Sequence, residues 1–262
     1  MRYLLTLYAD ESLNEASTPE ELKSMMDEYT ALSREWLGKG VMLSGEGLDP
    51  SSTATTVRVR GGERLITDGP FAESKEQLGG YYVVDCGSLD EAIELAARIP
   101  VTRRGSVEVR PVMNYEAMGA EAPTWRSESH AKKYVLTLWG DESAWETWSP
   151  EQLQENMSLW ADYDREATAA GVLLGGEGLE PSKTAKTVRV RDDERIVSDG
   201  PFAETKEQLG GFYLLDCKDL DQAIEWAAKV PMPDDEPVEI RPVMDYTGTS
   251  YEDIERGVEA RR

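Results

Sequence analysis

Apolar residues occupy both alternating sets of positions in the segment that opens the chain. Within residues 2–8, Tyr3, Leu5 and Leu7 form one set, and Leu4 and Tyr8 form the other. Successive residues of a strand point to opposite faces of its sheet. A strand that is apolar on both sets is typical of a sheet covered on both faces. The pattern therefore predicts a buried strand with a layer packed on each side.

The segment after this strand is a predicted helix, because its apolar residues recur at helical spacing. Thr18-Pro19-Glu20-Glu21 is typical of a helix start, with a capping box and proline at the first helical position. The helix should end near glycines 38 and 40, and its apolar stripe is Leu22, Met25, Met26, Tyr29, Leu32 and Trp36. A second, shorter helix is predicted to begin at Ser88, with Glu91 completing another capping box, and to stop before Pro100.

The remaining β-prone segments are predicted strands at 41–45, 55–60, 64–67, 80–86 and 106–113. The order β-α-β-β(-β)-β-α-β is the ferredoxin-like pattern with an extra hairpin. Two helices cover only one face of such a sheet, so the doubly apolar strands require a further layer.

The whole pattern occurs twice. YLLTLYADES at 3–12 returns as YVLTLWGDES at 134–143, an offset of 134 − 3 = 131, and DGPF at 68–71 returns at 199–202 with the same offset. A repeat of this length is a whole domain. We expect domains at 1–115 and 132–246, a linker at 116–131 and a tail at 247–262. The predicted fold class is α+β, with two ferredoxin-like domains packed sheet to sheet as an internal dimeric α+β barrel, monomeric in solution.

Charge and cysteine content narrow the function classes. The formal net charge of −23 repels phosphate backbones, which argues against nucleic-acid binding. No run approaches the ~18 apolar residues of a membrane span, and no leader-like segment precedes the first strand. Cys86 and Cys217 close equivalent apolar strands and are interpreted as buried hydrophobic residues in a reducing compartment. We therefore expect an acidic, cytoplasmic protein with no membrane partner.

The DGPF segment is the first candidate for chemistry. Asp68 ends a strand, Gly69 permits a positive φ, Pro70 fixes the chain and Phe71 can anchor the turn. A carboxylate at such a rigid corner is suited to act as a general base or as an acceptor for a ligand, and Asp199 is its twin. The alternative is a structural turn in which the carboxylate accepts from nearby backbone N–H groups.

Three further pairs at equivalent positions are weaker candidates for ligand binding: Glu46 with Glu177, Arg110 with Arg241, and Tyr8 with Trp139. The glutamates lie between glycines at strand ends, and exposed loop charges are the alternative. The arginines of the last strands suit an anionic ligand group, or else a cross-strand ion pair. The aromatic residues of the opening strands line a pocket or belong to the core.

Histidine is almost absent, and this excludes several classes of site. His130 is the only histidine, and it lies in the linker. A histidine-based triad or metal site is therefore not expected within the repeats. No P-loop or dinucleotide-binding glycine motif is present either. We expect no metal and no cofactor.

The stretch Asp68–Glu73, DGPFAE, followed by KEQLGGY at 75–81, resembles the signature of the YCII-related family in its DGPF-domain branch. The resemblance covers both repeats and implies a dimeric α+β barrel of ferredoxin-like subunits. Some members resemble small-molecule lyases or dehydrochlorinases that use a histidine–aspartate pair. Asp68 and Asp199 correspond to that aspartate, whereas the histidine has no counterpart in the repeats. Genes of this branch often lie beside those of extracytoplasmic-function sigma factors, which implies a regulatory role.

Two hypotheses follow. The first is a small-molecule binding protein or a cofactor-independent enzyme of the proton-transfer lyase or isomerase type. Its pocket would be anchored by Asp68 and Asp199, with Arg110 or Arg241 orienting an anionic group of the ligand. The alternative is a non-catalytic interaction or accessory module, for example one linked to sigma-factor regulation, in which DGPF is structural.

Overall fold

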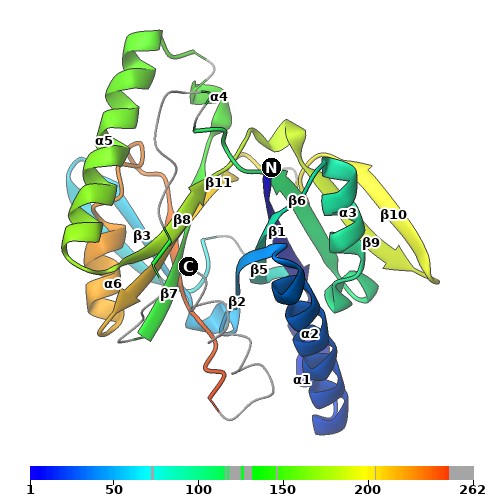
Figure 1. Ribbon diagram of the computed structural model, residues 1–262. Coiled ribbons are helices and arrows are strands. Elements are labelled where there is room, and N and C mark those ends of the chain that lie inside the picture. Colours follow the sequence, from blue (N-terminus) through cyan, green and yellow to red (C-terminus); the bar gives the residue numbers. More distant parts are fainter. Residues whose placement is uncertain are drawn as a thin grey trace.

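The computed structural model describes residues 1–71, 74–115, 117, 125–126, 132–145, 147–203 and 205–247. Two six-stranded antiparallel sheets face each other, and the helices lie on their outer sides (Figure 1). The predicted fold class is confirmed: the chain is α+β, with two ferredoxin-like domains packed sheet to sheet as an internal dimeric α+β barrel. Most of the expected linker and nearly all of the expected tail lie outside the described residues.

The elements of the two copies follow the same order. The first copy contains β1 (Arg2–Ala9), α1 (Ser12–Glu15), α2 (Pro19–Lys39), β2 (Met42–Gly47), β3 (Thr55–Arg60), β4 (Glu63–Asp68), β5 (Gln77–Asp85), α3 (Leu89–Ala97) and β6 (Ser106–Pro111). The second contains β7 (Lys132–Gly140), α4 (Glu142–Trp145), α5 (Pro150–Ala169), β8 (Leu173–Gly178), β9 (Lys186–Arg191), β10 (Glu194–Asp199), β11 (Gln208–Cys217), α6 (Leu220–Ala227) and β12 (Val238–Pro242). Short 3₁₀ helices lie at Ser51–Thr53, Pro100–Arg103 and Ser182–Thr184.

Helix starts were predicted well, with one difference in detail. At α2 the Thr18 hydroxyl accepts from the Glu21 backbone N–H, and the Glu21 carboxylate accepts from the Thr18 N–H, which completes the predicted capping box. At α3 the Ser88 hydroxyl accepts from the Glu91 N–H, but the Glu91 carboxylate accepts from Gly87 N instead of Ser88 N. The second capping box is therefore only half formed. The short helices α1 and α4 were not predicted, because a single turn shows no periodicity.

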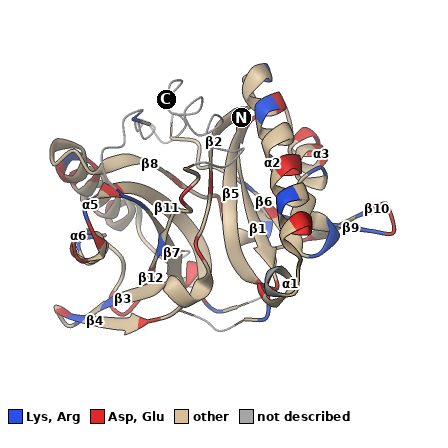
Figure 2. Cartoon of the chain, turned by 90° about the horizontal axis from the view of Figure 1, so that it is seen from below, with Lys and Arg blue, Asp and Glu red and all other residues tan. Residues whose placement is uncertain are grey.

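The two copies exchange a hairpin. The strand orders are β10-β9-β6-β1-β5-β2 and β4-β3-β12-β7-β11-β8. The β3–β4 hairpin of the first copy pairs with β12 of the second, and β9–β10 of the second pairs with β6 of the first. Each sheet therefore holds four strands of one copy and two of the other. The outer strands of the exchanged hairpins, β4 and β10, each form one edge of a sheet and project at opposite sides of the molecule (Figure 2).

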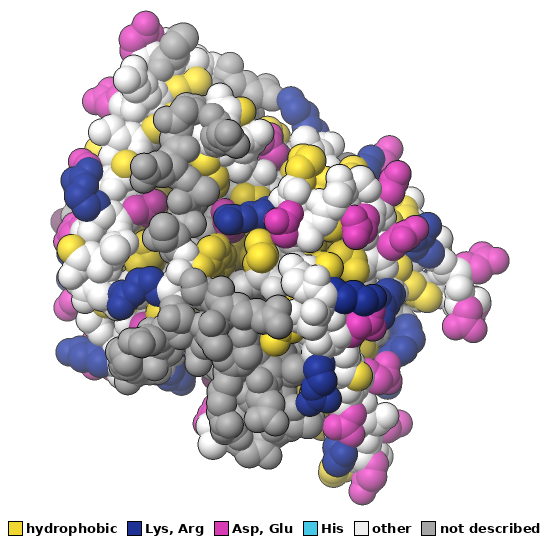
Figure 3. Space-filling model, viewed as in Figure 1, with side chains coloured by type: hydrophobic (Ala, Val, Ile, Leu, Met, Phe, Trp, Pro, Cys, Tyr) yellow, Lys and Arg dark blue, Asp and Glu magenta, His cyan; other side chains and the backbone are white. Residues whose placement is uncertain are grey.

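Three hydrophobic clusters account for the doubly apolar strands. One lies between the sheets and includes Leu4 and Val135. The others lie under the helices of each copy, where Leu5 and Leu136 take part. Adjacent residues of β1 thus enter different clusters, as the alternation predicted. Hydrophobic side chains also gather near the middle of the face in Figure 3, while acidic ones are spread mainly around its rim. Among the described helices, none is both long and apolar enough to span a membrane.

Candidate functional site

Each DGPF turn docks onto the opposite copy. Gly69 has φ +95° and Gly200 has φ +93°, so both glycines adopt the left-handed conformation that the sequence indicated. The Phe71 backbone N–H donates to Glu239 Oε2 at 3.1 Å, and the Phe202 N–H donates to Glu108 Oε2 at 2.8 Å. Since Glu239 belongs to the second copy and Glu108 to the first, these bonds secure the ends of the exchanged hairpins.

The phenylalanine rings of the two turns contact aromatic residues of the opposite copy. Phe202 stacks on Tyr8 with ring centroids 4.2 Å apart and planes 7° apart. Phe71 lies 4.5 Å from Trp139 between centroids, at 31°. Tyr8 and Trp139, both predicted site residues, therefore form part of the contact between copies. Offset aromatic pairs of this kind contribute about 0.5–1.5 kcal/mol beyond their buried area.

The DGPF aspartates themselves point into solvent. Asp68 is exposed at the end of β4. The Asp199 side chain is 90 % exposed and pairs with Lys186 at 2.5 Å, and this hydrogen bond and charge hold the pKa of Asp199 below its ordinary value. The backbone N–H of the following glycine, Gly69 or Gly200, donates to the carbonyl of Ala54 or Ala185. Neither aspartate lines the cavity described next.

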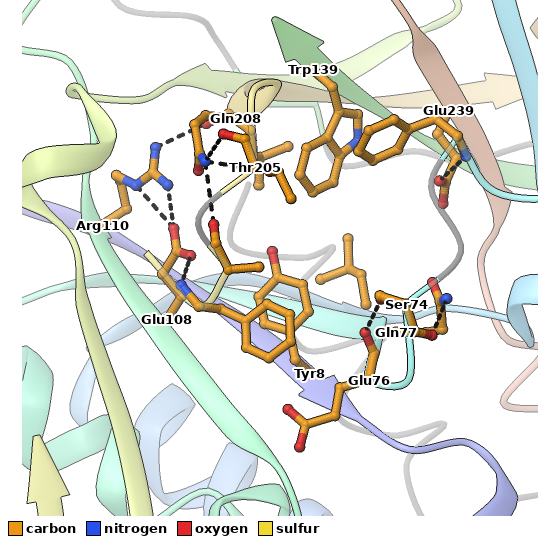
Figure 4. Close-up of a pocket in the computed structure, with 15 residues that line it drawn as sticks. Tyr8, Ser74, Glu76, Gln77, Glu108, Arg110, Trp139, Thr205, Gln208 and Glu239 are labelled. Atoms are coloured by element: carbon orange, nitrogen blue, oxygen red, sulfur yellow. Dashed lines mark hydrogen bonds and ion pairs between the residues drawn. The ribbon is translucent and has the colours of Figure 1, made fainter. Parts of the chain in front are cut away.

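A cavity lies where the two copies meet, with about 600 Å³ of unfilled space including its mouth (Figure 4). Both copies line it with equivalent residues, separated by 131 positions. These are Tyr8 and Trp139, Phe71 and Phe202, Ser74 and Thr205, Gln77 and Gln208, Leu78 and Leu209, and Glu108 and Glu239. Arg110 also lines it. The internal dimer thus builds one shared cavity, which we call the central cavity.

Buried ion pairs form its polar wall. Glu108 is 3 % exposed and Arg110 is 1 % exposed. Arg110 Nε donates to Glu108 Oε1 at 3.0 Å, a second guanidinium nitrogen contacts the same oxygen, and Nη1 donates to the Leu209 carbonyl at 2.9 Å. The structure therefore brings a predicted arginine into the cavity together with a glutamate that was not predicted.

The second copy repeats this arrangement. Arg241 is fully buried, and its Nη1 lies 3.2 Å from Glu239 Oε1. Its Nη2 donates to the carbonyls of Asp49 at 2.7 Å and Leu78 at 3.1 Å, which belong to the first copy. The sequence held a signal for the glutamates: each stands two positions before its arginine, in VEVRPV and VEIRPV. Alternation along a strand places such residues on the same face.

The aromatic walls carry polar atoms that already have partners. Burial raises the pKa of Tyr8 well above its ordinary value, so its hydroxyl stays neutral at physiological pH. Trp139 Nε1 donates to Thr137 Oγ1 at 2.9 Å. These two side chains are suited to contact a ligand with their rings and not to transfer protons.

Glu46 and Glu177 lie outside the central cavity. Lys133 Nζ lies 3.1 Å from Glu46 Oε1, and Arg2 Nη1 lies 2.9 Å from Glu177 Oε1. Each pair joins one copy to the other. Burial raises the pKa of Glu177, and the charge of Arg2 opposes that shift. The glutamates are buried and are not the exposed loop charges that one interpretation expected.

Among the residues that the structure describes, no three His, Cys, Asp or Glu side chains are arranged to hold a metal ion. His130 lies outside that set. Cys86 and Cys217 are both buried and unbridged.

Comparison with known proteins gives a sequence relative and remotely similar solved structures, two of which are described here. An uncharacterised protein of Rhizobium meliloti (strain 1021) is 41 % identical over 120 residues, which cover 44 % of this chain and 95 % of the relative. The relative therefore has about the length of one copy. A candidate chlorite dismutase has a TM-score of 0.44 at 8 % identity, covering 99 % of this chain and 98 % of its own. A heme-binding protein from Thermus thermophilus has a TM-score of 0.43 at 12 % identity, covering 94 % and 92 %.

The YCII-related domain model matches residues 1–116 and again residues 132–247. The two matches correspond to the two copies of the repeat and to the two ferredoxin-like halves of the barrel. The chain therefore belongs to the YCII-related family, as a tandem duplication of its domain.

Proposed function

We propose that this protein binds a small molecule in the central cavity. The observation that carries the proposal is the convergence of a buried ion pair, Glu108 with Arg110, on a cavity with aromatic walls from both copies. Ligand sites are typically concave, mostly apolar and supplied with a few placed polar groups. The cavity has this character (Figure 4).

The lining indicates the kind of ligand. Tyr8, Phe202, Phe71 and Trp139 offer ring faces and edges, which favour a flat or compact apolar body. Arg110 lines the cavity and favours an anionic or hydrogen-bond-accepting group on the ligand. We therefore propose a small molecule with an apolar body and one acidic or acceptor group.

The placement of Asp68 and Asp199 argues against an enzymatic role in which they act as bases. A general base must come within hydrogen-bond reach of the proton that it removes, about 2.6–3.2 Å. Both aspartates are exposed at the ends of β4 and β10, and neither lines the central cavity. Their placement favours binding over proton transfer.

A thermal-shift screen against small acids, phenols and lactones tests the proposal. A ligand at a hundred times its dissociation constant adds about 2.7 kcal/mol of stability. Hits should weaken in Trp139→Leu, which removes one aromatic wall, and should persist in the Asp68→Asn/Asp199→Asn double variant. Loss of binding only in the aspartate variant would move the site to the DGPF turns. No stabilising ligand for wild type would count against small-molecule binding.

The edge strands favour a second candidate function, an interaction module in which DGPF is structural. All residues of β4 and β10 are exposed, and the apolar ones are Leu65, Ile66, Ile196 and Val197. An open edge strand offers unpaired backbone groups to another chain. A partner recovered by wild type and lost in an Ile66→Lys/Ile196→Lys variant would support this role. Equal recovery by both proteins would reject the edge strands as the docking surface.

A further inference from the structure

The chain leaves the sheets in the same way at the end of each copy. After β6, the Met113 backbone N–H donates to the Gly178 carbonyl of β8 at 2.9 Å. After β12, the Met244 N–H donates to the Gly47 carbonyl of β2 at 3.0 Å. In both copies a tyrosine hydroxyl two residues later accepts from the N–H of the same glycine. The two exits are therefore equivalent, and each leads the chain onto the other copy.

Beyond the first exit, the chain covers one side of the second copy. The Trp125 ring lies so close to Gly175 that a Cβ added there would be 2.0 Å from its Cε3 atom. Trp125 Nε1 donates to Glu177 Oε1 at 3.1 Å. The next residue, Arg126, donates its N–H to the Leu174 carbonyl at 2.7 Å, which holds this segment along β8.

Beyond the second exit, the described residues leave a groove on the first copy, between α2 and the sheet at β2 and β5. It encloses about 1,980 Å³ of unfilled space, including solvent at its mouth. We call it the copy-1 groove. Met25, Met26 and Tyr29 of α2 line it, and so does Met244 at the exit itself. The second exit therefore opens directly into the groove.

One wall of the groove is the first half of the apolar stripe of α2. Leu32 and Trp36, in the second half of the helix, are buried as expected. Met25, Met26 and Tyr29, in the first half, are only half-buried. The stripe thus continues past the core of its own copy, and its first half is available to a further apolar segment.

The sequence after the second exit has the length and the apolar residues for this role. Residues 247–262 follow Tyr246, and the position equivalent to Trp125 is residue 256, which is 125 + 131. Tyr251, Ile254 and Val258 are the large apolar residues of this stretch, at the spacing of one face of an amphipathic helix. The stretch is therefore long enough to reach the groove and carries side chains suited to it.

The floor of the groove differs from its counterpart in a way that matches this stretch. Ser44 stands where the second copy has Gly175, so its Cβ occupies the space that an indole ring would need. Ser44 is buried, and its Oγ lies 3.3 Å from Tyr81 Oη. The floor is closed to an indole, and residues 247–262 contain no tryptophan. Aliphatic anchors that rest against α2, above the floor, fit the first copy better.

We propose that the C-terminal segment 248–262, which lies outside the described residues, docks in the copy-1 groove. Ile254 and Val258 contact Met25, Met26 and Tyr29, so the chain covers the first copy as the Trp125 segment covers the second. A tethered segment meets its groove at an effective concentration of about millimolar, so a few apolar contacts suffice. The proposal does not depend on ligand binding in the central cavity.

Charge at the groove agrees with this occupant. Glu21 and Glu28 of α2 line the groove, and Arg103 and Arg104 line it as well. The C-terminal segment also carries both signs, with four acidic and three basic residues between positions 248 and 262. A rim of mixed charge suits such a segment and does not favour a partner with charge of one sign.

Methionine oxidation in the full-length protein tests the proposal. Dilute hydrogen peroxide converts accessible methionine to its sulfoxide, and peptide mass spectrometry gives the rate at each residue. Ile254→Asp/Val258→Asp should release the segment and speed the oxidation of Met25 and Met26 about threefold or more. Met157, the equivalent of Met26 on α5, is the internal control and should keep its wild-type rate.

A second variant separates release of the segment from the effect of added charge. Thr249→Asp/Ser250→Asp adds the same two charges outside the apolar positions and should leave the oxidation of Met25 and Met26 at the wild-type rate. Disulfide trapping then locates the docked segment. Met26→Cys should form an intramolecular disulfide with Ile254→Cys or with Val258→Cys, whereas Met157→Cys should form one with neither.

Three outcomes would overturn the proposal. The first is an unchanged oxidation rate of Met25 and Met26 in Ile254→Asp/Val258→Asp. The second is equal acceleration by the Thr249→Asp/Ser250→Asp control. The third is disulfides that form only between chains, because the occupant of the groove would then be the segment of a second copy.

Discussion

Replacing Glu108 with glutamine should strongly destabilise the fold. Both carboxylate oxygens of Glu108 accept hydrogen bonds, Oε1 from Arg110 and Oε2 from the Phe202 N–H. Glutamine has a single oxygen, so in either orientation its NH₂ group meets another donor. The Arg110 guanidinium, 1 % exposed, also loses its buried counter-charge. Breaking a buried pair by removing one partner costs about 3–5 kcal/mol.

Thermal unfolding followed by circular dichroism at pH 7 measures this effect. A change of 1 kcal/mol shifts the midpoint of a protein near this size by about 2–4 °C. A loss of about 3 kcal/mol therefore predicts a midpoint about 6–12 °C lower. Glu63→Gln, on the exposed strand β4, is the matched control and should stay within about 0.5 kcal/mol of wild type.

A double variant tests the cause of the destabilisation. Adding Arg110→Met to Glu108→Gln removes the guanidinium that has lost its buried counter-charge, so the double variant should lose less stability than the sum of the two single changes. If Glu108→Gln costs no more than the Glu63 control, the pair does not hold the two copies together. Strict additivity of the two changes would also refute the reasoning.

Three further predictions concern other parts of the chain. Burial raises the pKa of Cys217 to about 12, so iodoacetamide at pH 8 should leave this thiol unmodified until the protein unfolds; labelling in the native state would contradict its burial. Hydrogen bonds from Arg98 and Lys39 lower the pKa of Glu35 to about 2. The stability that the charged Glu35 carboxylate gives the folded state is therefore present above about pH 4.5 and is lost as the pH falls towards 2. Arg98→Ala should raise this pKa towards 4.5 in an NMR titration, and an unchanged value would reject the pairing. Residues 1–131 expressed alone should form a dimer, because their sheet lacks β9 and β10, and light scattering measures this. A folded monomer would show that the β3–β4 hairpin can pair with its own copy.

The helices and the layer order could be predicted from sequence because their causes are local or periodic. The Thr18–Glu21 capping box joins residues three apart, and its geometry follows from the helix start alone. The alternation of Leu4 and Leu5 required a layer on each face of β1, and both layers are present. The repeat offset of 131 then identified the second copy as the missing layer.

The candidate site was predicted only in part. Arg110, Tyr8 and Trp139 line the central cavity, but Asp68 does not, and Glu108 was missed. Asp68 was predicted as a site residue because the DGPF segment around it is distinctive in sequence. In the structure the backbone N–H of Phe71 and its ring make the contacts to the opposite copy, while the carboxylate of Asp68 stays in solvent.

The sequence by itself determined the two ferredoxin-like units, their capped helices and the burial of both sheet faces, because each follows from spacing within one copy. It did not determine which sheet each hairpin joins. The strands VEVRPV and VEIRPV offer nearly the same edge, so pairing within a copy and pairing across copies satisfy the same local pattern. Only the tertiary structure places β3 beside β12 and β9 beside β6. That exchange brings Glu108 to Phe202 and Glu239 to Phe71, and with them the residues of the central cavity, because these contacts depend on distances between chain segments far apart in sequence.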